Sequence, residues 1–371
     1  MSGPRPIAPR PGILEIEPYQ GGLSDLEGRS DVIKLSSNEG ALGPSPKAMA
    51  AFEAAADDLG RYPDGACSAL RAAIGARFGL DPERIVCGAG SDELLGLLAR
   101  AYAGEGDEVL YSEHGFLIYP IAAMAVGAAP VKVAEIGLKA DVDGFIGRAG
   151  NRTRLVYIAN PNNPTGSYLS ADELRRLRAG LPEGVVLVID AAYAEYVTEA
   201  DYEAGVALVD EGENTVMTRT FSKIFGLGGL RLGWAYGPPH VIDVLNRLRM
   251  PFNVSSAAQA AGIAALADRD HTEAAIAHNT DERARLAAAL AAAGLEVPPS
   301  AGNFVLARFP GGARQAEAAD RHLKSQGIIV RRMGAYGLPD SLRITVGLHD
   351  EMTAAAAALT EFMASEEGGD G

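Results

Sequence analysis

The feature that most constrains the fold is an alternation of strand and helix patterns over about two thirds of the chain. Short apolar runs rich in Val, Ile and Leu recur at about 84–87, 107–112, 129–134, 154–159, 185–189, 215–219 and 231–236. Helix or loop patterns separate these runs, which predicts an α/β fold with a mostly parallel sheet covered on both faces. Ligands of such sheets bind at the carboxyl ends of the strands.

The pattern changes after about residue 238. Long alanine-rich helices are predicted at about 239–250, 255–267 and 271–293, and shorter ones at about 314–326 and 350–364. Three short strands are predicted among them, at about 303–308, 328–331 and 342–346. This mixture is typical of a smaller α+β unit.

Three parts of the chain are therefore expected. Residues 1–30 are rich in Pro, Gly and Arg and have no sustained period, so they are interpreted as an extended arm. Residues 31–250 would form the large unit and residues 251–371 the small one. The tail from Glu366 to Gly371 is expected to be disordered.

Charge and composition exclude several classes of function. A formal net charge of -15 disfavours nucleic acid or an acidic membrane as a partner, because both need a basic face. An anionic substrate would have to be held by a few local arginines. Cys67 and Cys87 form no disulfide framework and no metal-ligand spacing. Without a signal-like or membrane-spanning stretch, the protein is expected to be soluble and cytoplasmic.

A lysine with unusual neighbours follows the strand predicted at 215–219. Lys223 comes after Ser222 and lies near four glycines, in a chain where six of the 33 basic residues are lysines. Arginine keeps its proton in proteins, so a lysine at this place indicates amine chemistry. Apolar surroundings and a nearby cation such as Arg231 lower the pKa of a lysine, whose free amine can form a Schiff base. The alternative is an ordinary surface charge on a loop.

Two other predicted strands end in polar groups. Asp190 closes the buried strand at 185–189 and is followed by Tyr193, and Asn163 comes shortly after the strand at 154–159. A carboxylate at such a strand end can hold the ring nitrogen of pyridoxal phosphate in its protonated form, and Tyr193 and Asn163 can bond the phenolic oxygen. The alternatives are a turn-forming Asp and a rigid Asn-Pro turn.

Backbone amides are expected to be free near residues 88–91. The turn from Gly88 to Gly90 follows a predicted strand, and Ser91 is expected to cap the next helix. Its similarity to a dinucleotide fingerprint is weak, because Glu93 occupies the place of the third glycine. A helix N-terminus of this kind can still hold a phosphate.

Three more side chains are candidates for ligand contact. Phe116 follows a predicted strand and could stack on a ring, although aromatic residues at such turns are more often core. Arg331 and Arg343 lie at the end of, or within, apolar strands. Exposed strand arginines are common, but Arg343 has apolar neighbours on both sides and could hold a carboxylate or phosphate with a bidentate fork.

Together these residues resemble the fold-type I pyridoxal-phosphate aminotransferases, and more narrowly the histidinol-phosphate aminotransferases. The family-wide marks are the Asn163 to Gly166 turn, Asp190 with Tyr193, and Ser222-Lys223 followed by Arg231. The narrower marks are Lys34 to Glu39, Leu42 to Pro46, Arg61 to Asp64, Gly90 to Glu93 and Leu342 to Gly347. The resemblance covers about Pro18 to Gly347.

The resemblance implies a role for each matched residue. Lys223 would form the Schiff base and move the proton at the substrate Cα, Asp190 would pair with the pyridinium nitrogen, and Phe116 would stack on the ring. Tyr193 and Asn163 would bond the phenolic oxygen. The cofactor phosphate would be held by Ala89, Gly90, Ser91, Thr220, Ser222, Arg231 and, from the second subunit of a homodimer, Tyr62. The substrate would be bound by Arg343, Arg331, Tyr19 and Asn38.

The implied reaction moves an amino group between L-histidinol phosphate or imidazole-acetol phosphate and glutamate or 2-oxoglutarate, in histidine biosynthesis. Rivals with the same cofactor are an aromatic amino-acid aminotransferase and a threonine-phosphate decarboxylase. A cofactor-binding regulatory domain is disfavoured because the expected arm is not a basic DNA-binding module, and a nicotinamide dehydrogenase is disfavoured by Glu93. Two departures from the family pattern are Gly40-Ala41, where Asn-Pro is usual, and Phe116, where tyrosine is common.

Overall fold

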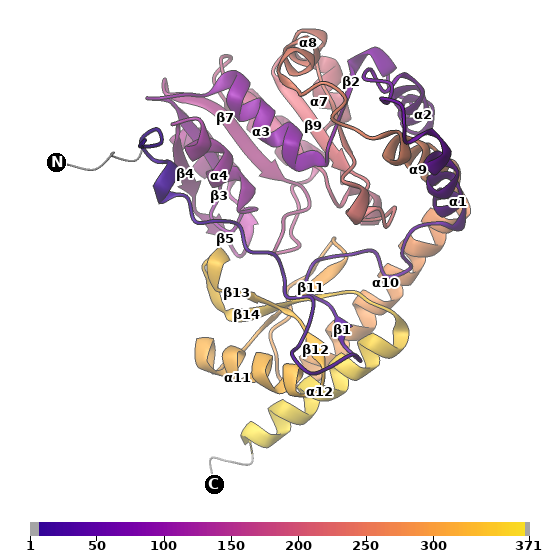
Figure 1. The fold of residues 1–371 in the computed structure, drawn as a ribbon. Helices are drawn as coiled ribbons and strands as arrows, with labels where there is room; N and C mark the ends of the chain where they lie inside the picture. Colours follow the sequence, from indigo (N-terminus) through magenta and orange to yellow (C-terminus); the bar gives the residue numbers. More distant parts are fainter. Residues whose placement is uncertain (1–6, 368–371) are drawn as a thin grey trace, which may run out of the picture.

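The computed structural model describes residues 7–367, which form two groups of strands with helices around them (Figure 1). The larger group lies in the upper part of Figure 1 and the smaller group in the lower part. The prediction of a disordered tail is wrong for Glu366 and Glu367, which are helical, and residues 368–371 lie outside the described residues. No helix within residues 7–367 has both the length and the hydropathy needed to cross a bilayer.

The large sheet has seven strands in the order β2-β10-β9-β8-β7-β3-β4. Their bounds are Ile85–Gly88, Gly233–Tyr236, Thr215–Thr220, Val186–Asp190, Thr153–Ala159, Glu108–Ser112 and Ala129–Val133. All neighbouring pairs are parallel except those of β10, which is antiparallel to β2 and to β9. The predicted α/β fold with a mostly parallel sheet is confirmed.

Both faces of this sheet are buried, because successive side chains along a strand point to opposite sides. In β8, Val186 and Val188 join the apolar cluster under α3, α4 and α8, whereas Leu187 and Ile189 join the cluster under α5, α6 and α7. The bounds of these helices are Ser91–Tyr102, Ile118–Ala125, Pro239–Leu248, Val142–Arg148, Ala171–Gly180 and Val206–Glu211. The expected double cover is therefore present.

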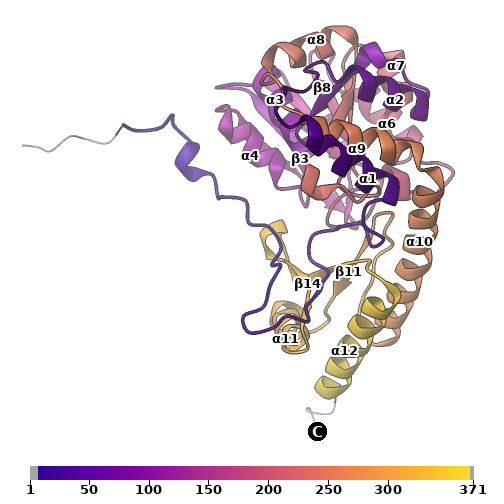
Figure 2. The same ribbon diagram turned by 45° about the vertical axis from the view of Figure 1, so that its right-hand side comes forward.

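The smaller group consists of a three-stranded sheet, β11-β14-β13, and a two-stranded pair, β1-β12. Their bounds are Phe304–Arg308, Leu338–Thr345, Arg331–Met333, Ile33–Lys34 and Ile328–Ile329. Apolar residues of the helices α10 (Arg269–Ala292), α11 (Gly312–Ser325) and α12 (His349–Glu367) pack against these strands. Figure 2 shows α10 running from the larger part of the molecule to the smaller one.

The division at residues 30 and 250 stays a prediction, and two contacts cross it. β1, expected in the large unit, pairs in parallel with β12. α9 (Ser256–Ala267), expected in the small unit, packs on α1 (Pro46–Ala54) and α2 (Ser68–Phe78). Figure 2 shows the first described residues of the arm projecting from the body, whereas its later residues lie against the body, where Tyr19 contacts Phe116. Its regular structure within residues 7–30 is one 3₁₀ turn, Ile13–Glu15.

Helix caps decide where several site residues lie. Ser45 caps α1, and Ser170 caps α6 in a capping box with Glu173. The prediction that Ser91 caps α3 is wrong, because Gly90 is the N-cap and Ser91 is the first helical residue. Gly90 has a φ of 83° and a ψ of 165°, a conformation that residues with a Cβ rarely adopt.

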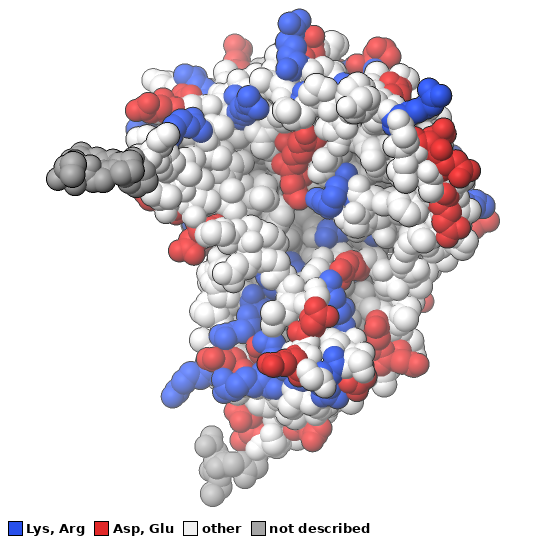
Figure 3. All heavy atoms as spheres, in the orientation of Figure 1, with Lys and Arg blue, Asp and Glu red and all other residues white. Residues whose placement is uncertain are grey.

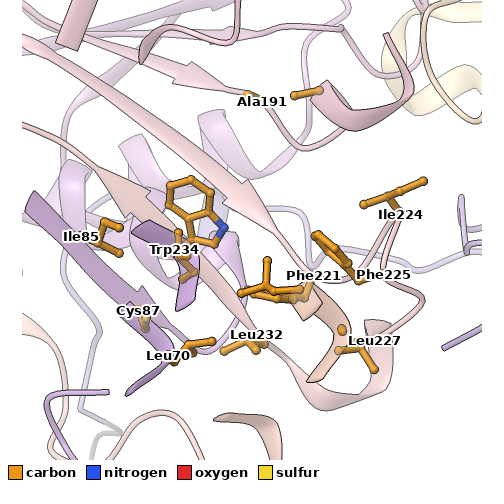
Figure 4. Packing of buried hydrophobic residues seen from close by; sticks show 14 of the residues in the cluster. Leu70, Ile85, Cys87, Ala191, Phe221, Ile224, Phe225, Leu227, Leu232 and Trp234 are labelled. Carbon is orange, nitrogen blue, oxygen red and sulfur yellow. The ribbon is translucent and has the colours of Figure 1, made fainter. Parts of the chain in front are cut away.

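An apolar core supports the turn that carries Lys223 (Figure 4). Phe221 and Ile224, on either side of the Ser222-Lys223 pair, are buried in the same cluster as Trp234 and Leu232. Figure 4 shows Phe221 beside Leu232 and Phe225, with Ile224 farther along the turn. Burial of these side chains fixes both ends of the turn and therefore the position of Ser222 and Lys223 between them.

Candidate active site

A cavity of about 350 Å³ lies where the carboxyl ends of β7, β8 and β9 face the smaller group of strands. Figure 3 shows a hollow between the upper and lower halves of the molecule, with basic and acidic side chains at its edges. The cavity brings together most of the predicted site residues: Tyr19, Asn38, Ser91, Phe116, Asn163, Asp190, Tyr193, Thr220, Ser222, Lys223, Arg231, Arg331 and Arg343. These residues are separated by up to 324 positions in sequence.

Asp190 is the last residue of β8 and is 5% exposed. Its neighbours in the sheet register are Ala159 on β7 and Thr218 on β9. Tyr119 Oη donates to Asp190 Oδ2 at 2.8 Å, and Thr218 Oγ1 donates to Oδ1 at 3.3 Å. Burial raises the pKa of Asp190 to about 6, against the opposing effect of these donors. The carboxylate can therefore bind a cationic N–H group, which would stabilise the ionised form that burial disfavours.

Lys223 lies in the turn between β9 and β10 and points into the same cavity. Its Nζ donates to the carbonyl oxygen of Ser37 at 3.3 Å and lies 5.7 Å from the centre of the Tyr193 ring. Burial is the main cause that lowers the pKa of Lys223 to about 8, and the charge of Arg343 adds to it. An amine with this pKa is partly neutral near physiological pH and can act as a nucleophile.

Two predicted donors have their orientation set by neighbours. Arg343 Nη1 donates to Asn163 Oδ1, which leaves the amide protons of Asn163 for the cavity. Asn38 Nδ2 donates to Tyr193 Oη at 2.9 Å. Arg343 also donates through Nη2 to the carbonyl oxygen of Ser36 at 2.9 Å. Its buried Nε has no hydrogen-bond partner among the described residues, so a donor is left for a ligand.

The predicted phosphate group of residues lies at the N-terminus of α3. Thr220 Oγ1 donates to Ser222 Oγ at 2.9 Å, and Arg231 Nη1 lies 3.4 Å from that same oxygen. Arg231 Nη2 lies 3.1 Å from Asp92 Oδ2. A Cβ added at Gly90 would lie 2.5 Å from Arg231 Nη2, so the guanidinium approaches this helix end closely because residue 90 is glycine. The hydroxyls, the guanidinium and the helix N-terminus together suit an anion.

The substrate residues lie at the other end of the cavity. Tyr19, from the arm, meets the ring of Phe116 edge to face with centroids 6.2 Å apart. Arg331 donates through Nη2 to the carbonyl oxygen of Gln20, which holds the arm against β13. The arm therefore forms one wall of the cavity.

Three predicted cofactor residues are outside the cavity lining. The amide of Ala89 is not free as expected, because it donates to Glu93 Oε2 at 2.6 Å. Gly90 acts through its lack of a side chain. Tyr62 is 83% exposed and stacks on Phe252, with ring centroids 4.7 Å apart. Its role with a partner subunit stays a prediction.

The unusual Gly40 is closely packed. A Cβ added there would lie 2.7 Å from the carbonyl oxygen of Lys223. Glycine at residue 40 thus lets the loop after β1 approach the lysine turn.

The sequence argument missed three residues in contact with site groups. Tyr119, in α4, reaches Asp190 across a sequence separation of 71. Thr218 is opposite Asp190 in the register, and Thr345 contacts Asn38 across a sequence separation of 307. None of these three contacts has a local sequence signal.

The family model for aminotransferases of class I and II matches residues 30–359. The chain belongs to this aminotransferase family. It is therefore a transaminase, and the predicted resemblance to the histidinol-phosphate branch is confirmed by its relatives. A histidinol-phosphate aminotransferase of Rhodospirillum centenum is 60% identical over 363 residues, which cover 98% of this chain and 99% of the relative. One of Paramagnetospirillum magneticum is 58% identical over 357 residues, 96% of this chain and 98% of the relative.

Solved structures of aminotransferases share the fold. A histidinol-phosphate aminotransferase of Sinorhizobium meliloti, in complex with pyridoxal-5'-phosphate, is 33% identical and superposes with a TM-score of 0.87 over 91% of this chain and 93% of that one. An aspartate aminotransferase of Thermus thermophilus, at 22% identity, has a TM-score of 0.79 over 90% of this chain and 92% of that one. This second likeness concerns the fold alone.

Proposed function

We propose that this transaminase binds pyridoxal 5'-phosphate in the cavity and moves an amino group between L-histidinol phosphate or imidazole-acetol phosphate and glutamate or 2-oxoglutarate, in the synthesis of histidine. The observation that carries the proposal is the meeting of three groups in one cavity: the Lys223 amine, the buried Asp190 carboxylate and the buried Arg343 guanidinium. The relatives from Rhodospirillum centenum and Sinorhizobium meliloti support the choice of substrate and cofactor.

The donor set fits this cofactor at each end. Asp190 suits a protonated ring nitrogen, Asn163 and Tyr193 offer donors to a phenolic oxygen, and Ser222 with Arg231 suits a phosphate. When bound, pyridoxal phosphate supplies an electron sink for bonds at the substrate Cα. Burial of Asp190 makes its charge act at full strength on the ring nitrogen, since little water screens it.

Lys223 has two tasks in the proposed reaction. Its amine would hold the cofactor covalently between turnovers until the amine of the substrate displaces it. The freed amine would then move the proton from the substrate Cα to the cofactor. The pKa of about 8 suits both tasks, because a general base works best when its pKa is close to the working pH. Ping-pong kinetics follow, since the amino group is left on the enzyme when the first product departs.

Arg343 and Arg331 would bind the anionic ends of the substrates. Arg343 is 5% exposed, and its pKa is lowered mainly by burial, so it gains most from a carboxylate or phosphate partner. Arg331 is half-buried and is held by the arm. Tyr19 and Asn38 are near these groups and would complete the substrate end.

A substrate panel tests the choice of substrate. We expect kcat/KM with histidinol phosphate and 2-oxoglutarate to exceed that with phenylalanine and 2-oxoglutarate by at least about a hundredfold, because the singly charged carboxylate of phenylalanine does not replace a dianionic phosphate on Arg343 and Arg331. A preference for phenylalanine would assign an aromatic aminotransferase. Carbon dioxide released from threonine phosphate would assign the decarboxylase.

A separate measurement tests the cofactor. Wild-type protein incubated with pyridoxal phosphate should absorb in the visible range, and borohydride should bleach the band and fix the cofactor to Lys223. Lys223→Ala should retain no cofactor after borohydride and dialysis. Lys139→Ala is the matched control, because Lys139 pairs with Glu173 on the surface. Cofactor fixed to another lysine would refute the assigned role.

We also propose that the enzyme works as a homodimer. Large apolar side chains are exposed on neighbouring elements around the Tyr62–Phe252 stack, namely Met49, Phe52, Leu59, Tyr62, Met250 and Phe252. Monomers rarely expose so many large apolar residues close together, so a second copy is the partner that this surface fits.

A further inference from the structure

A short chain of hydrogen bonds leads from the smaller sheet to the cavity. Asn38, which is 1% exposed, donates its backbone N–H to Thr345 Oγ1 at 2.9 Å. Thr345 Oγ1 donates in turn to Asn38 Oδ1 at 3.2 Å. Asn38 Nδ2 donates to Tyr193 Oη at 2.9 Å. The three side chains come from the loop after β1, from the end of β14 and from the turn after β8.

The direction of donation in this chain is determined by Thr345. A hydroxyl has one proton, and the backbone N–H of Asn38 occupies an acceptor position on Thr345 Oγ1. Among the described residues, Asn38 Oδ1 is the acceptor that the Thr345 hydroxyl reaches. If the side-chain amide of Asn38 were flipped, Thr345 Oγ1 would face two N–H donors, the backbone N–H and the side-chain NH₂ of Asn38. The buried hydroxyl proton of Thr345 would then have no acceptor, which would destabilise the folded protein.

The backbone of Asn38 is also fixed. Its φ is 54°, in the left-handed region that asparagine tolerates better than most residues. Asn303 Nδ2 donates to its carbonyl oxygen at 3.1 Å. The amide therefore has little freedom to move, and Tyr193 Oη accepts its hydrogen bond from a fixed direction.

Tyr193 is left with its own proton to give. The Oη accepts from Asn38 and, among the described residues, donates to no protein acceptor, while the side chain lines the cavity. The ring is held edge to face against Phe304, with centroids 5.4 Å apart. The free direction for the hydroxyl proton is therefore into the cavity.

We propose that Thr345 and Asn38 are positioning residues that turn the hydroxyl proton of Tyr193 toward the phenolic oxygen of the bound cofactor. The proposal rests on the proposed function, and it adds that the relay begins on β14, the strand that also carries Arg343. Arg343 orients Asn163 in the same way, by donating a hydrogen bond to Asn163 Oδ1. Residues 343 and 345 share one face of the strand, so a single strand orients both donors to that oxygen.

The holoenzyme provides the main test, because the pH titration of its visible band reports how well that oxygen is stabilised as an anion. Loss of a donor should move the midpoint upward. We expect Thr345→Val to raise it by about one pH unit, and Tyr193→Phe to raise it at least as far. The midpoint of Asn38→Asp should match that of Tyr193→Phe, because the Tyr193 hydroxyl would donate its hydrogen bond to the new carboxylate and no longer point into the cavity. Thr345→Ser, which keeps the hydroxyl, should titrate like wild type.

Thr215→Val is the matched control. Thr215 is also a fully buried strand threonine, and its Oγ1 has no hydrogen-bond partner among the described residues. Thr215→Val should lower the free energy of unfolding no more than Thr345→Val does, and it should leave the midpoint of the pH titration unchanged. If Thr345→Val has the wild-type midpoint while Tyr193→Phe is shifted, the relay is refuted.

A cofactor-free measurement separates the relay from the proposed function. In protein labelled at asparagine, the side-chain amide protons of Asn38 should exchange with solvent roughly tenfold faster, or more, in Thr345→Val than in wild type or Thr345→Ser. Equal exchange in all three would overturn the relay, even if the enzyme transaminates. Faster exchange in Thr345→Val, together with a wild type that forms no visible band, would leave the relay's geometry intact and reject the proposed function.

Discussion

Burial shifts the pKa values of Asp190 and Lys223 in opposite directions, and both move toward neutrality. The pKa of the carboxyl rises to about 6 and that of the amine falls to about 8. Each charge is therefore held at a cost to the folded protein that lacks a ligand. A ligand that places a cation beside Asp190 and reacts with the amine of Lys223 removes both desolvation penalties. Their free energy then adds to the affinity for the ligand.

Asp190→Asn should stabilise the cofactor-free protein at neutral pH. Because the folded-state pKa lies above the ordinary 3.8, the folded protein binds more protons between about pH 4 and 6 and loses stability as pH rises through that range. The variant lacks this titration, so its free energy of unfolding at pH 7 should be higher by roughly 3 kcal/mol. Urea unfolding at pH 4.5 and 7 measures it. A variant with the wild-type pH slope would contradict the assignment.

Lys223→Met should have a similar effect in a different pH range. The folded-state pKa of about 8 lies below the ordinary 10.5, so the unfolded chain binds more protons between these values and wild-type stability rises with pH. At pH 7 the variant should be more stable by on the order of 2 kcal/mol, since part of the side chain faces the cavity and burial is incomplete. Denaturant unfolding from pH 7 to 10 would show the wild-type rise, and its persistence in the variant would count against a buried amine.

These residues show what sequence reasoning could reach at this scale. Lys223, Asp190 and Asn163 follow buried strands, so the topology alone predicts that they meet. Tyr119 and Thr345 were missed because their partners are set by packing between distant segments. Periodicity reports which face of an element is buried, but it carries no information about which polar group lies opposite.

At the scale of elements, the turn from β2 into α3 should depend on Gly90 more than on Ser91. Gly90→Ala would combine a φ of 83° with a Cβ placed 2.5 Å from Arg231 Nη2. We expect it to cost about 1–3 kcal/mol of stability and at least about tenfold in cofactor affinity, because Arg231 must move. Equilibrium dialysis with pyridoxal phosphate and thermal unfolding measure the two effects.

Gly96→Ala, two turns along α3, is the matched control. A Cβ there would meet nothing within 4 Å. Alanine is the better helix former, so this variant should be as stable as wild type or more so by up to about 1 kcal/mol. Equal losses of cofactor affinity in the two variants would show that the effect belongs to the helix and not to its N-terminus.

Element boundaries were predicted where strong local signals exist. The strands of the large sheet agree with the structure within a few residues. The hairpin of β5 (Glu135–Ile136) and β6 (Lys139–Ala140) was not predicted. Its turn contains Leu138 at a φ of 65°, and a leucine in the left-handed region is not a turn signal.

At the scale of the whole molecule, the apolar surface around Tyr62 and Phe252 is the feature that the single chain leaves unexplained. Phe252→Asp should convert the proposed dimer into monomers, because a charge in a buried apolar interface is costly. Ile136→Asp is the control, since Ile136 is 70% exposed on the β5–β6 hairpin, away from that surface. Sedimentation velocity distinguishes them, and a wild-type monomer would refute the dimer.

Mixed dimers test whether Tyr62 serves its own subunit or the partner. Tyr62→Ala should weaken cofactor binding by roughly tenfold to a hundredfold, the usual worth of a hydrogen bond to a charged group. A hybrid of one Tyr62→Ala and one Lys223→Ala subunit, isolated with two affinity tags, has one site with both an intact Lys223 and Tyr62 from the other chain. If Tyr62 acts across the interface, this hybrid regains one tight, borohydride-fixable site per dimer. If Tyr62 acts within its own chain, the only site with a lysine lacks it, and binding stays as weak as in the Tyr62→Ala homodimer.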